Sequence, residues 1–311
     1  MTTSHDHHHP HLLRGILLIM SSVFLFSSMD TLAKFMLRSY PLPPLIWARY
    51  AVHFGFMIAL FAPRMGLGLV RTQRPLLQLL RGLALVASTG FFYLALTYLP
   101  LAEAAAISFV APVLVASLSG PMLGERVTRR QWIAVTMGFL GVLVIIRPGG
   151  GLLSFAVVFP LMSAFVFALY QILTRKLAGR ENPFTSLFYT ALVGTVVTTA
   201  GLPFAWQTPT MMQVGIMIAM GCLGGFGHYL MIHAVERASP SALAPFIYTQ
   251  LIWSTLLAFL AFREFPDPIS LLGMLVIAAA GLLSINWKQV RQRIGAAQRD
   301  PAPISARREE T

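Results

Sequence analysis

The chain has 311 residues, of which 56% are hydrophobic and only 11% are charged. A soluble globular domain carries about 25% charged residues, so this composition excludes an ordinary soluble protein and indicates a membrane protein. The single cysteine, Cys222, excludes a disulfide framework and a cysteine-based metal site.

The chain begins with a polar, histidine-rich segment, which we predict to be a disordered cytoplasmic tail over residues 1–11. Its five histidines could bind a metal ion, but such tracts are compositional signals only, and the disordered tail is the favoured interpretation. The apolar run after Gly15 is longer than that of a signal peptide and lacks a clear cleavage site. It therefore predicts an uncleaved first transmembrane helix.

Apolar runs recur along the whole chain, and a membrane-spanning helix needs about 20 mostly apolar residues. Proline and glycine separate the runs, as expected for turns, and Asp267 followed by Pro268 is a typical helix start. We predict ten transmembrane helices: 12–37, 44–62, 76–98, 101–122, 128–146, 152–174, 184–203, 211–235, 240–262 and 268–286.

Lysine and arginine predict the orientation of these helices, because cytoplasmic links carry an excess of both. With the N-terminus in the cytoplasm, 18 of the 23 cations fall on the cytoplasmic side, Arg81 among them. The five on the other side are Lys34, Arg38, Arg49, Arg147 and Arg263. We therefore expect both termini in the cytoplasm, which requires an even number of spans.

Two 25-residue stretches, Leu101–Glu125 and Pro240–Glu264, share one pattern: an apolar helix associated with a proline at its start and a glutamate at its end. Their spacing indicates an internal repeat of about 140 residues. Five helices per repeat is an odd number, so the second copy must cross the membrane in the opposite sense, as in many secondary transporters. We therefore predict repeats over 12–148 and 152–287 around a central cavity, followed by a disordered basic cytoplasmic tail, 288–311.

The chain resembles the EamA family of the drug/metabolite transporter superfamily over roughly residues 12–287. The motifs that carry the resemblance are Asp30-x-x-x-Lys34, Trp47-Ala-Arg49-Tyr50, Leu123-Gly-Glu125, Gly138-x-x-Gly141 and Ala244–Trp253. The resemblance implies a transport role and a cavity lined by the first, third, fourth, sixth, eighth and ninth helices. It implies much less about the solute.

Charged groups inside a bilayer are costly, so each should have a partner or a function. Asp30 and Lys34 lie one helical turn apart, and we expect them to form an internal pair. They could form a gate-side salt bridge, or Asp30 could contact substrate or couple transport to protons. Glu103, in the first turn of the fourth helix, is a further candidate for coupling or gating, although a structural role is favoured.

Three other groups are expected to be mainly structural. Arg49 and His53 share a face of the second helix, with Arg49 near the outer interface. Glu125 and Glu264 are expected to hold helix hairpins together through arginines in the adjacent links. His228 lies on the glycine-rich eighth helix beside Gly221-x-x-x-Gly225; it is either a packing residue or part of a substrate or proton path.

A site for an amphipathic metabolite needs apolar walls and a few hydrogen-bonding groups. Aromatic stripes are usually packing features, but several mid-helix side chains on the predicted cavity helices supply this mixture. With Asp30 and His228, the candidate substrate-binding residues are Ser88, Phe92, Phe109, Tyr170, Gln171, Tyr248, Gln250 and Trp253. We expect no metal site and no cofactor.

The favoured function is a secondary transporter of the bacterial inner membrane, exporting small amphipathic metabolites such as amino acids. A lipid or carrier flippase of the same fold is the alternative. An intramembrane enzyme is disfavoured because the acids are scattered singly and no metal–diphosphate, HExxH, GxSxG or phosphate-loop motif occurs. The expected partners are a small-molecule substrate and the lipid bilayer, with no nucleic acid; a homodimer is left open.

Overall fold

A computed structural model describes residues 9–124, 129–146, 155–237, 243 and 246–284. Within these ranges the chain is all-helical and contains no strand, as the sequence predicts. The helices are α1 (His9–Leu37), α2 (Leu42–Met65), α3 (Pro75–Tyr98), α4 (Leu101–Ser108), α5 (Ala111–Leu123), α6 (Arg129–Ile146), α7 (Val158–Leu177), α8 (Pro183–Thr199), α9 (Leu202–Ala205), α10 (Met211–Arg237), α12 (Thr249–Phe262) and α13 (Pro268–Ser284), with short 3-10 turns η1 (Gly66–Leu69) and η2 (Phe155–Val157).

The starts of several helices follow directly from local sequence. Proline occupies the first position of α3, α8 and α13, where its missing N–H costs no hydrogen bond. Asn182 caps α8 by accepting a hydrogen bond from Phe184 N at 2.8 Å. Asp267 caps α13 by accepting from Ile269 N and Ser270 N at 2.9 and 3.0 Å, so the predicted start of the last helix is correct.

The predicted span 101–122 is not one continuous helix. Helix α4 ends at Ser108 and α5 begins at Ala111, with Pro112 in its first turn. Pro112 has no N–H to donate to the carbonyl of Ser108, so the regular helix cannot continue through this point. The polypeptide therefore changes direction within an apolar segment.

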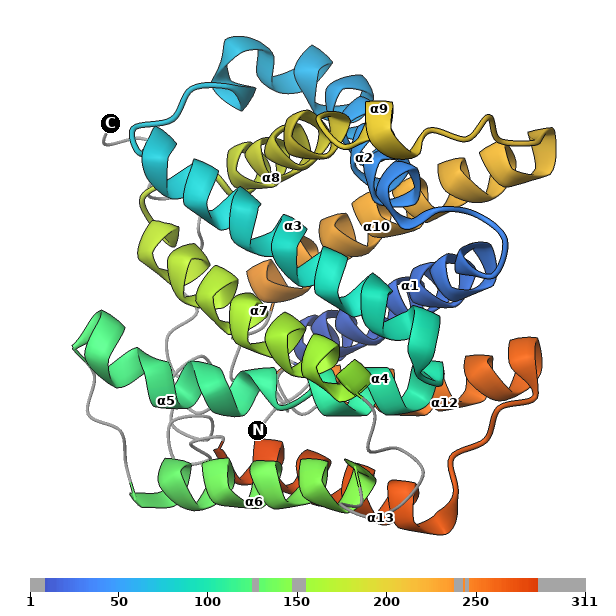
Figure 1. The fold of residues 1–311 in the computed structure, drawn as a ribbon. Helices are drawn as coiled ribbons and strands as arrows, with labels where there is room; N and C mark the ends of the chain where they lie inside the picture. The colour runs from blue at the N-terminus through green and yellow to red at the C-terminus, as the bar shows by residue number, and fades with distance from the viewer. Residues whose placement is uncertain (1–8, 125–128, 147–154, 238–242, 244–245, 285–311) are drawn as a thin grey trace, which may run out of the picture.

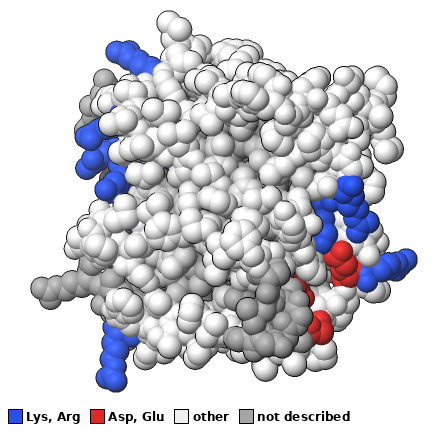
Figure 2. All heavy atoms as spheres, viewed as in Figure 1, with Lys and Arg blue, Asp and Glu red and all other residues white. Residues whose placement is uncertain are grey.

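Among the described residues, five helical segments are long and apolar enough to cross a bilayer, or six if the bent α4–α5 pair is one span. They are Leu13–Leu37, Leu42–Leu69, Pro75–Tyr98, Phe155–Leu177 and Met211–Arg237, and three shorter apolar helices accompany them. Charged side chains gather at the left and right margins of the face drawn in Figure 2, and the broad band between them is uncharged. Large apolar side chains such as Phe139, Ile252 and Leu275 are exposed, as expected for surfaces that face lipid.

Helices from the two halves of the chain pack against each other in pairs (Figure 1). Helix α1 lies along α10, α3 along α7, and α2 against α8. At the bottom of Figure 1, α6 and α13 lie side by side, and neither helix contacts another neighbour as extensively. Each half thus completes its packing only with the other half.

The α6–α13 contact depends on two glycines. A Cβ at Gly141 would lie 2.7 Å from Ile277 Cγ1 and 3.0 Å from the Gly273 carbonyl oxygen. A Cβ at Gly273 would lie 2.5 Å from Ile145 Cγ1 and 2.8 Å from the Gly141 carbonyl oxygen. The two backbones therefore approach each other with no room for a side chain, as in other close contacts between membrane helices.

We expect Gly141→Ala to destabilise the protein by about 1–3 kcal/mol, because the added methyl group must displace packed atoms. Gly215→Ala on α10 is the control: a Cβ there meets no atom within 4 Å, and alanine is the better helix former. The melting temperatures of the purified proteins in detergent should move in opposite directions. A Gly141→Ala protein as stable as the parent would contradict the backbone contact.

Candidate functional site

Polar side chains from four helices meet inside the bundle. We call them the central cluster: Asp30 on α1, Arg49, Tyr50 and His53 on α2, Thr89 and Tyr93 on α3, and His228 on α10. All except Arg49 and His228 are buried. Three of these helices, α1, α3 and α10, belong to the set that the family resemblance implies as cavity walls.

Arg49 is the cation at the centre of this cluster. Its Nη1 donates a hydrogen bond to Thr89 Oγ1 at 3.1 Å, and its guanidinium lies 5.4 Å from the ring centres of both Tyr50 and Tyr93. Thr89 Oγ1 also lies 2.9 Å from the Tyr50 hydroxyl. Its side chain therefore points into the bundle, where two aromatic faces and a hydroxyl hold it, and the expected position of Arg49 near the outer interface stays a prediction.

Two histidines stack beside the arginine. The rings of His53 and His228 are nearly parallel, with centres 5.7 Å apart, and Phe26 meets His228 edge-on at 4.8 Å. The Nε2 atom of His53 is buried and has no hydrogen-bond partner in the described part of the chain. Gly225 on α10 permits this arrangement, because a Cβ there would lie 3.2 Å from His53 Cδ2.

Asp30 faces the cluster with only 8% of its surface exposed. Among the described residues no side chain or backbone N–H donates a hydrogen bond to its carboxylate, and no cation lies within ion-pair distance. Arg49 is the cation that acts on it electrostatically. The predicted internal pair of Asp30 with Lys34 is therefore not formed.

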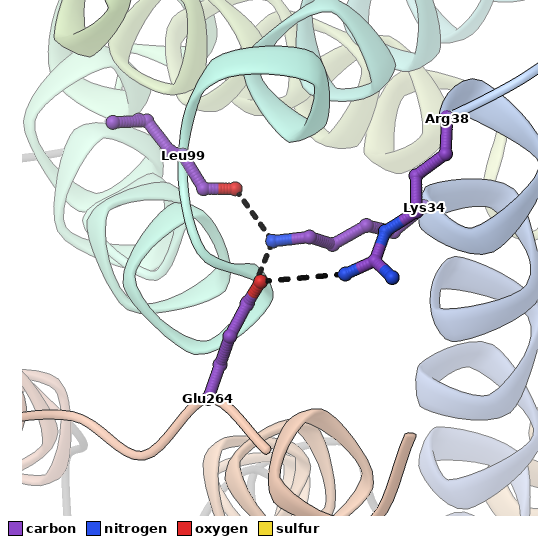
Figure 3. Close-up of polar contacts among 4 residues, drawn as sticks. All are labelled: Lys34, Arg38, Leu99 and Glu264. Carbon is purple, nitrogen blue, oxygen red and sulfur yellow. Dashed lines mark hydrogen bonds and ion pairs between the residues drawn. The ribbon is translucent and has the colours of Figure 1, made fainter. Parts of the chain in front are cut away.

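Lys34 instead joins the two halves of the chain (Figure 3). Its Nζ donates to Glu264 Oε2 at 2.7 Å and to the Leu99 carbonyl at 2.9 Å. Arg38 adds a longer contact of 3.8 Å to the same carboxylate. Glu264 thus pairs with Lys34 of α1 and Arg38 just after it, and not with an arginine of its own hairpin, which corrects the sequence-based expectation. Glu125 lies outside the described residues.

A pocket of about 340 Å³ opens beside this contact. Lys34, Arg38 and Glu264 supply its charges, and Tyr98 and Pro100 are part of its wall. We call Lys34, Leu99 and Glu264 the Lys34 bridge. It closes the end of the bundle where α1 ends, α4 begins and α12 gives way to α13.

The opposite end of the bundle also carries contacts between the halves. The η1–α3 link meets the start of α8, where Gln73 N donates to Glu181 Oε1 at 2.8 Å and Tyr189 donates to the Val70 carbonyl at 2.8 Å. Thr185 adds a hydrogen bond of 3.1 Å to the Gly68 carbonyl. The central cluster therefore lies between two sets of contacts that join the first half to the second.

A second arginine inside the bundle, Arg81 on α3, is buried and fully engaged by the protein. Nε donates to Thr174 at 2.7 Å, Nη1 to Thr190 and the Ser186 carbonyl at 2.6 and 2.7 Å, and Nη2 to the Tyr170 hydroxyl at 2.9 Å. Counting Arg81 among the cations of a cytoplasmic link is therefore wrong. The hydroxyl of the candidate residue Tyr170 is occupied by this arginine.

Several other candidate residues serve helix packing. Ser88 Oγ lies 3.1 Å from both the carbonyl oxygen and Oγ of Ser163 and so joins α3 to α7. Glu103 is buried and accepts from Ser270 of α13 at 3.3 Å. Gln171 is exposed on α7, away from the central cluster.

The aromatic candidates are also taken up by packing. The Tyr248 hydroxyl is directed at α13, where a Cβ on Gly281 would overlap it, and its ring contacts Phe109 at 5.3 Å. Trp253 meets Phe24 edge-on at 5.0 Å. Phe92 packs partly buried against the hydrophobic core, and Gln250 is half-buried. Of the candidates from sequence, only Asp30 and His228 belong to the central cluster.

Sequence reasoning missed Arg49, His53, Thr89 and Tyr93. A signal for Arg49 existed, because an arginine in the apolar second helix requires a partner. The four-residue spacing of Arg49 and His53 also placed them on one face of that helix. What the sequence did not contain was the direction in which that face points.

The sequence model of the EamA-like transporter family matches residues 13–147 and again residues 154–286. The chain belongs to this family. Two matches in tandem correspond to two EamA repeats, so the resemblance noted from the sequence is confirmed.

Several EamA-family transporters are similar over most of the chain. An S-adenosylmethionine uptake transporter of Rickettsia prowazekii is 28% identical over 88% of this chain and 92% of its own. The pseudopaline exporter of Pseudomonas aeruginosa is 27% identical over 86% and 94%, and a riboflavin transporter of Vibrio cholerae is 26% identical over 92% and 97%. One crystal structure matches with a TM-score of 0.65 over 89% of this chain and 98% of its own; at 19% identity it supports the fold alone.

We expect Glu264→Gln to destabilise this EamA protein by about 1–2 kcal/mol. The value lies between those of exposed and fully buried pairs, because the Lys34 side chain is 8% exposed and that of Glu264 is 31% exposed. Arg38→Gln is the matched control: its contact with Glu264 is longer and its side chain is 55% exposed, so the change should stay below about 0.5 kcal/mol. Equal melting temperatures for the two variants in detergent would show that Lys34 does not depend on Glu264.

Proposed function

We propose that the chain is a secondary transporter with ten transmembrane helices in two inverted repeats, 12–148 and 152–287, flanked by the tails 1–11 and 288–311. The observation that carries this proposal is the polar central cluster, to which both halves of the chain contribute, in a member of a transporter family. The central cluster is the substrate site, and it is exposed alternately to the two sides of the membrane. Such folds place the site near the midplane, at the interface of the repeats.

The helix pairing supports inverted repeats. In the proposed order, α1 is the first helix and α7 the sixth, while α3 is the third and α10 the eighth. Exchanging the repeats then converts the α1–α10 contact into the α7–α3 contact, and both contacts are present. The same exchange leaves the α6–α13 contact unchanged, because α6 and α13 are the last helices of the two repeats and each brings one of the two glycines.

The Lys34 bridge is the outer gate in this mechanism. It joins the first helix to the link after the ninth, so the halves cannot separate at that end while the ammonium holds both acceptors. Opening requires Glu264 to exchange Lys34 for water, which is feasible because its side chain is partly exposed. Contacts of the η1–α3 link with the start of α8 form the inner gate.

The cargo is a small amphipathic metabolite. The relatives move S-adenosylmethionine, pseudopaline and riboflavin, all of them small organic solutes. They include both uptake and export, so export by this chain stays a prediction. Asp30 and His228 are the coupling candidates in the site, and Lys34 is the gating residue; Glu103, bonded to Ser270, holds α4 to α13.

The chain lies in a bacterial inner membrane with both termini in the cytoplasm. The bundle end with α2–α3 and α7–α8 links carries the exposed cations Arg64, Arg71, Arg74, Arg175, Lys176 and Arg180. This bias supports the cytoplasmic assignment of that end. The excess of cations on the cytoplasmic side remains when Arg49 and Arg81 are left out of the count, because each side then loses one.

Orientation can be tested with single cysteines on a Cys222→Ser background. Ser39 and Gln73 are exposed in links at opposite ends of the bundle. We expect Ser39→Cys to react with a membrane-impermeant maleimide on spheroplasts, and Gln73→Cys to react only after lysis. Labelling of Gln73→Cys on intact spheroplasts would indicate the opposite orientation.

Transport can be tested with the purified full chain in liposomes loaded with amino acids, S-adenosylmethionine and riboflavin. At least one solute should leave faster than from protein-free liposomes. Asp30→Asn should slow this solute by about tenfold, the effect of losing roughly 1.4 kcal/mol of interaction.

Ser28→Ala is the matched control on the same helix, since its hydroxyl bonds only to the Phe24 carbonyl; its rate should not change. Melting temperatures establish that each variant is folded. If folded protein releases every solute no faster than empty liposomes under any gradient, the proposed function is wrong.

A further inference from the structure

We propose that the central cluster is built for a zwitterion of the amino-acid type, with the ligand carboxylate on Arg49 and its cationic centre on Asp30. The inference rests on the proposed function and adds the charge pattern of the substrate. It assigns binding roles to Arg49 and to the rings that hold it.

The two arginines inside the bundle differ in how their donors are used. Arg81 engages all three guanidinium nitrogens with Tyr170, Thr174, Ser186 and Thr190. Among the described residues Arg49 donates only from Nη1, to Thr89, and the Tyr93 hydroxyl acts on it electrostatically. It is also less buried than the residues around it. The donors of Arg81 are used by the protein, whereas Arg49 keeps donors for a ligand.

Arg49 is nevertheless held in place. Its guanidinium lies over the rings of Tyr50 and Tyr93, which are 1% and 0% exposed. Thr89 fixes Nη1, and the Tyr50 hydroxyl fixes Thr89. A fork of parallel N–H donors held in this way suits the two oxygens of a carboxylate.

Asp30 supplies the opposite charge at the other side of the cluster. Its carboxylate accepts no hydrogen bond from the described residues, and no ion pair within 4.0 Å joins it to Arg49. The two opposite charges therefore act on each other without direct contact, and we infer that a ligand binds between them. The charges of a zwitterion would satisfy both groups at once.

Burial makes this charge pattern selective. Each uncompensated charge in the bilayer interior costs about 2.5–3.5 kcal/mol on insertion scales. A ligand with a single charge pairs with Asp30 or with Arg49 but leaves the other without a counter-ion. The occupied site then carries one uncompensated charge. The unpartnered Nε2 of His53 is a further polar atom beside this space. The site therefore discriminates by the number and sign of charges.

The test measures the melting temperature of the full chain in detergent with matched ligands. The probes are the twenty standard amino acids and any solute that moves in the liposome assay. Each ligand that binds is compared with its decarboxylated amine and its deaminated acid. We expect a zwitterion to raise the melting temperature, since it binds only the folded protein, and both single-charge analogues to bind at least tenfold more weakly.

Two variants should change the preference and not only weaken it. In Asp30→Asn the deaminated acid should bind as well as the zwitterion, because the ammonium has lost its partner. In Arg49→Gln the amine should bind as well as the zwitterion. Arg64→Gln removes an exposed arginine from the same helix as Arg49 and should keep the original ranking. A purely structural role for Asp30 or Arg49 would not produce these opposite changes.

Three results bear on the proposal. Single-charge analogues that bind the parent protein as well as the zwitterion would overturn it. Transport of a neutral or singly charged solute, with no zwitterion raising the melting temperature, would overturn it and leave the transporter function intact. Absence of any solute movement in the liposome assay would contradict both the transporter function and the zwitterion site.

Discussion

A charge inside an apolar bundle must be compensated, and this constraint explains the polar interior of the protein. The described helices carry few ionisable side chains between their ends, and three of these are matched by protein groups in different ways. Arg81 is matched by hydroxyls and a carbonyl, Lys34 by a carboxylate and a carbonyl, and Glu103 by a serine hydroxyl. Asp30 and Arg49 are the pair that the protein leaves incompletely matched, and the proposed ligand site rests on that difference.

The scaffold brings the site together from distant parts of the chain. Arg81 ties α3 to α7 and α8, and Ser88 repeats the α3–α7 contact through Ser163. On the other side, Ser22 of α1 donates to the Gly227 carbonyl of α10 at 2.8 Å. Glycines on α10 bring it close enough to α1 and α2 for His228 to stack on His53. The side chains of the central cluster thus lie on helices whose positions are fixed by contacts outside the cluster.

Much of the fold could be predicted from the sequence, because apolar runs, prolines and caps are local signals. Asp267 and Pro268 marked the start of α13 correctly, and the close approach at Gly221 is real, since a Cβ there would lie 2.4 Å from Val52. The partners of the polar side chains were predicted less well, because partners far apart in sequence compete with near ones. Lys34 had Asp30 one turn away but pairs with Glu264, 230 positions later. The candidate residues Tyr248 and Gln171 are not part of the central cluster, since Tyr248 packs on α13 and Gln171 is exposed. The direction of each side chain depends on the rotation of its helix, which tertiary packing sets.

The glycine contact between α6 and α13 has a consequence for motion. Two backbones in direct contact, with Ile277 and Ile145 set against the opposite glycine, cannot slide past each other without a collision. In the proposed alternating-access mechanism, this pair is therefore the fixed contact about which the other helices of each half would rotate.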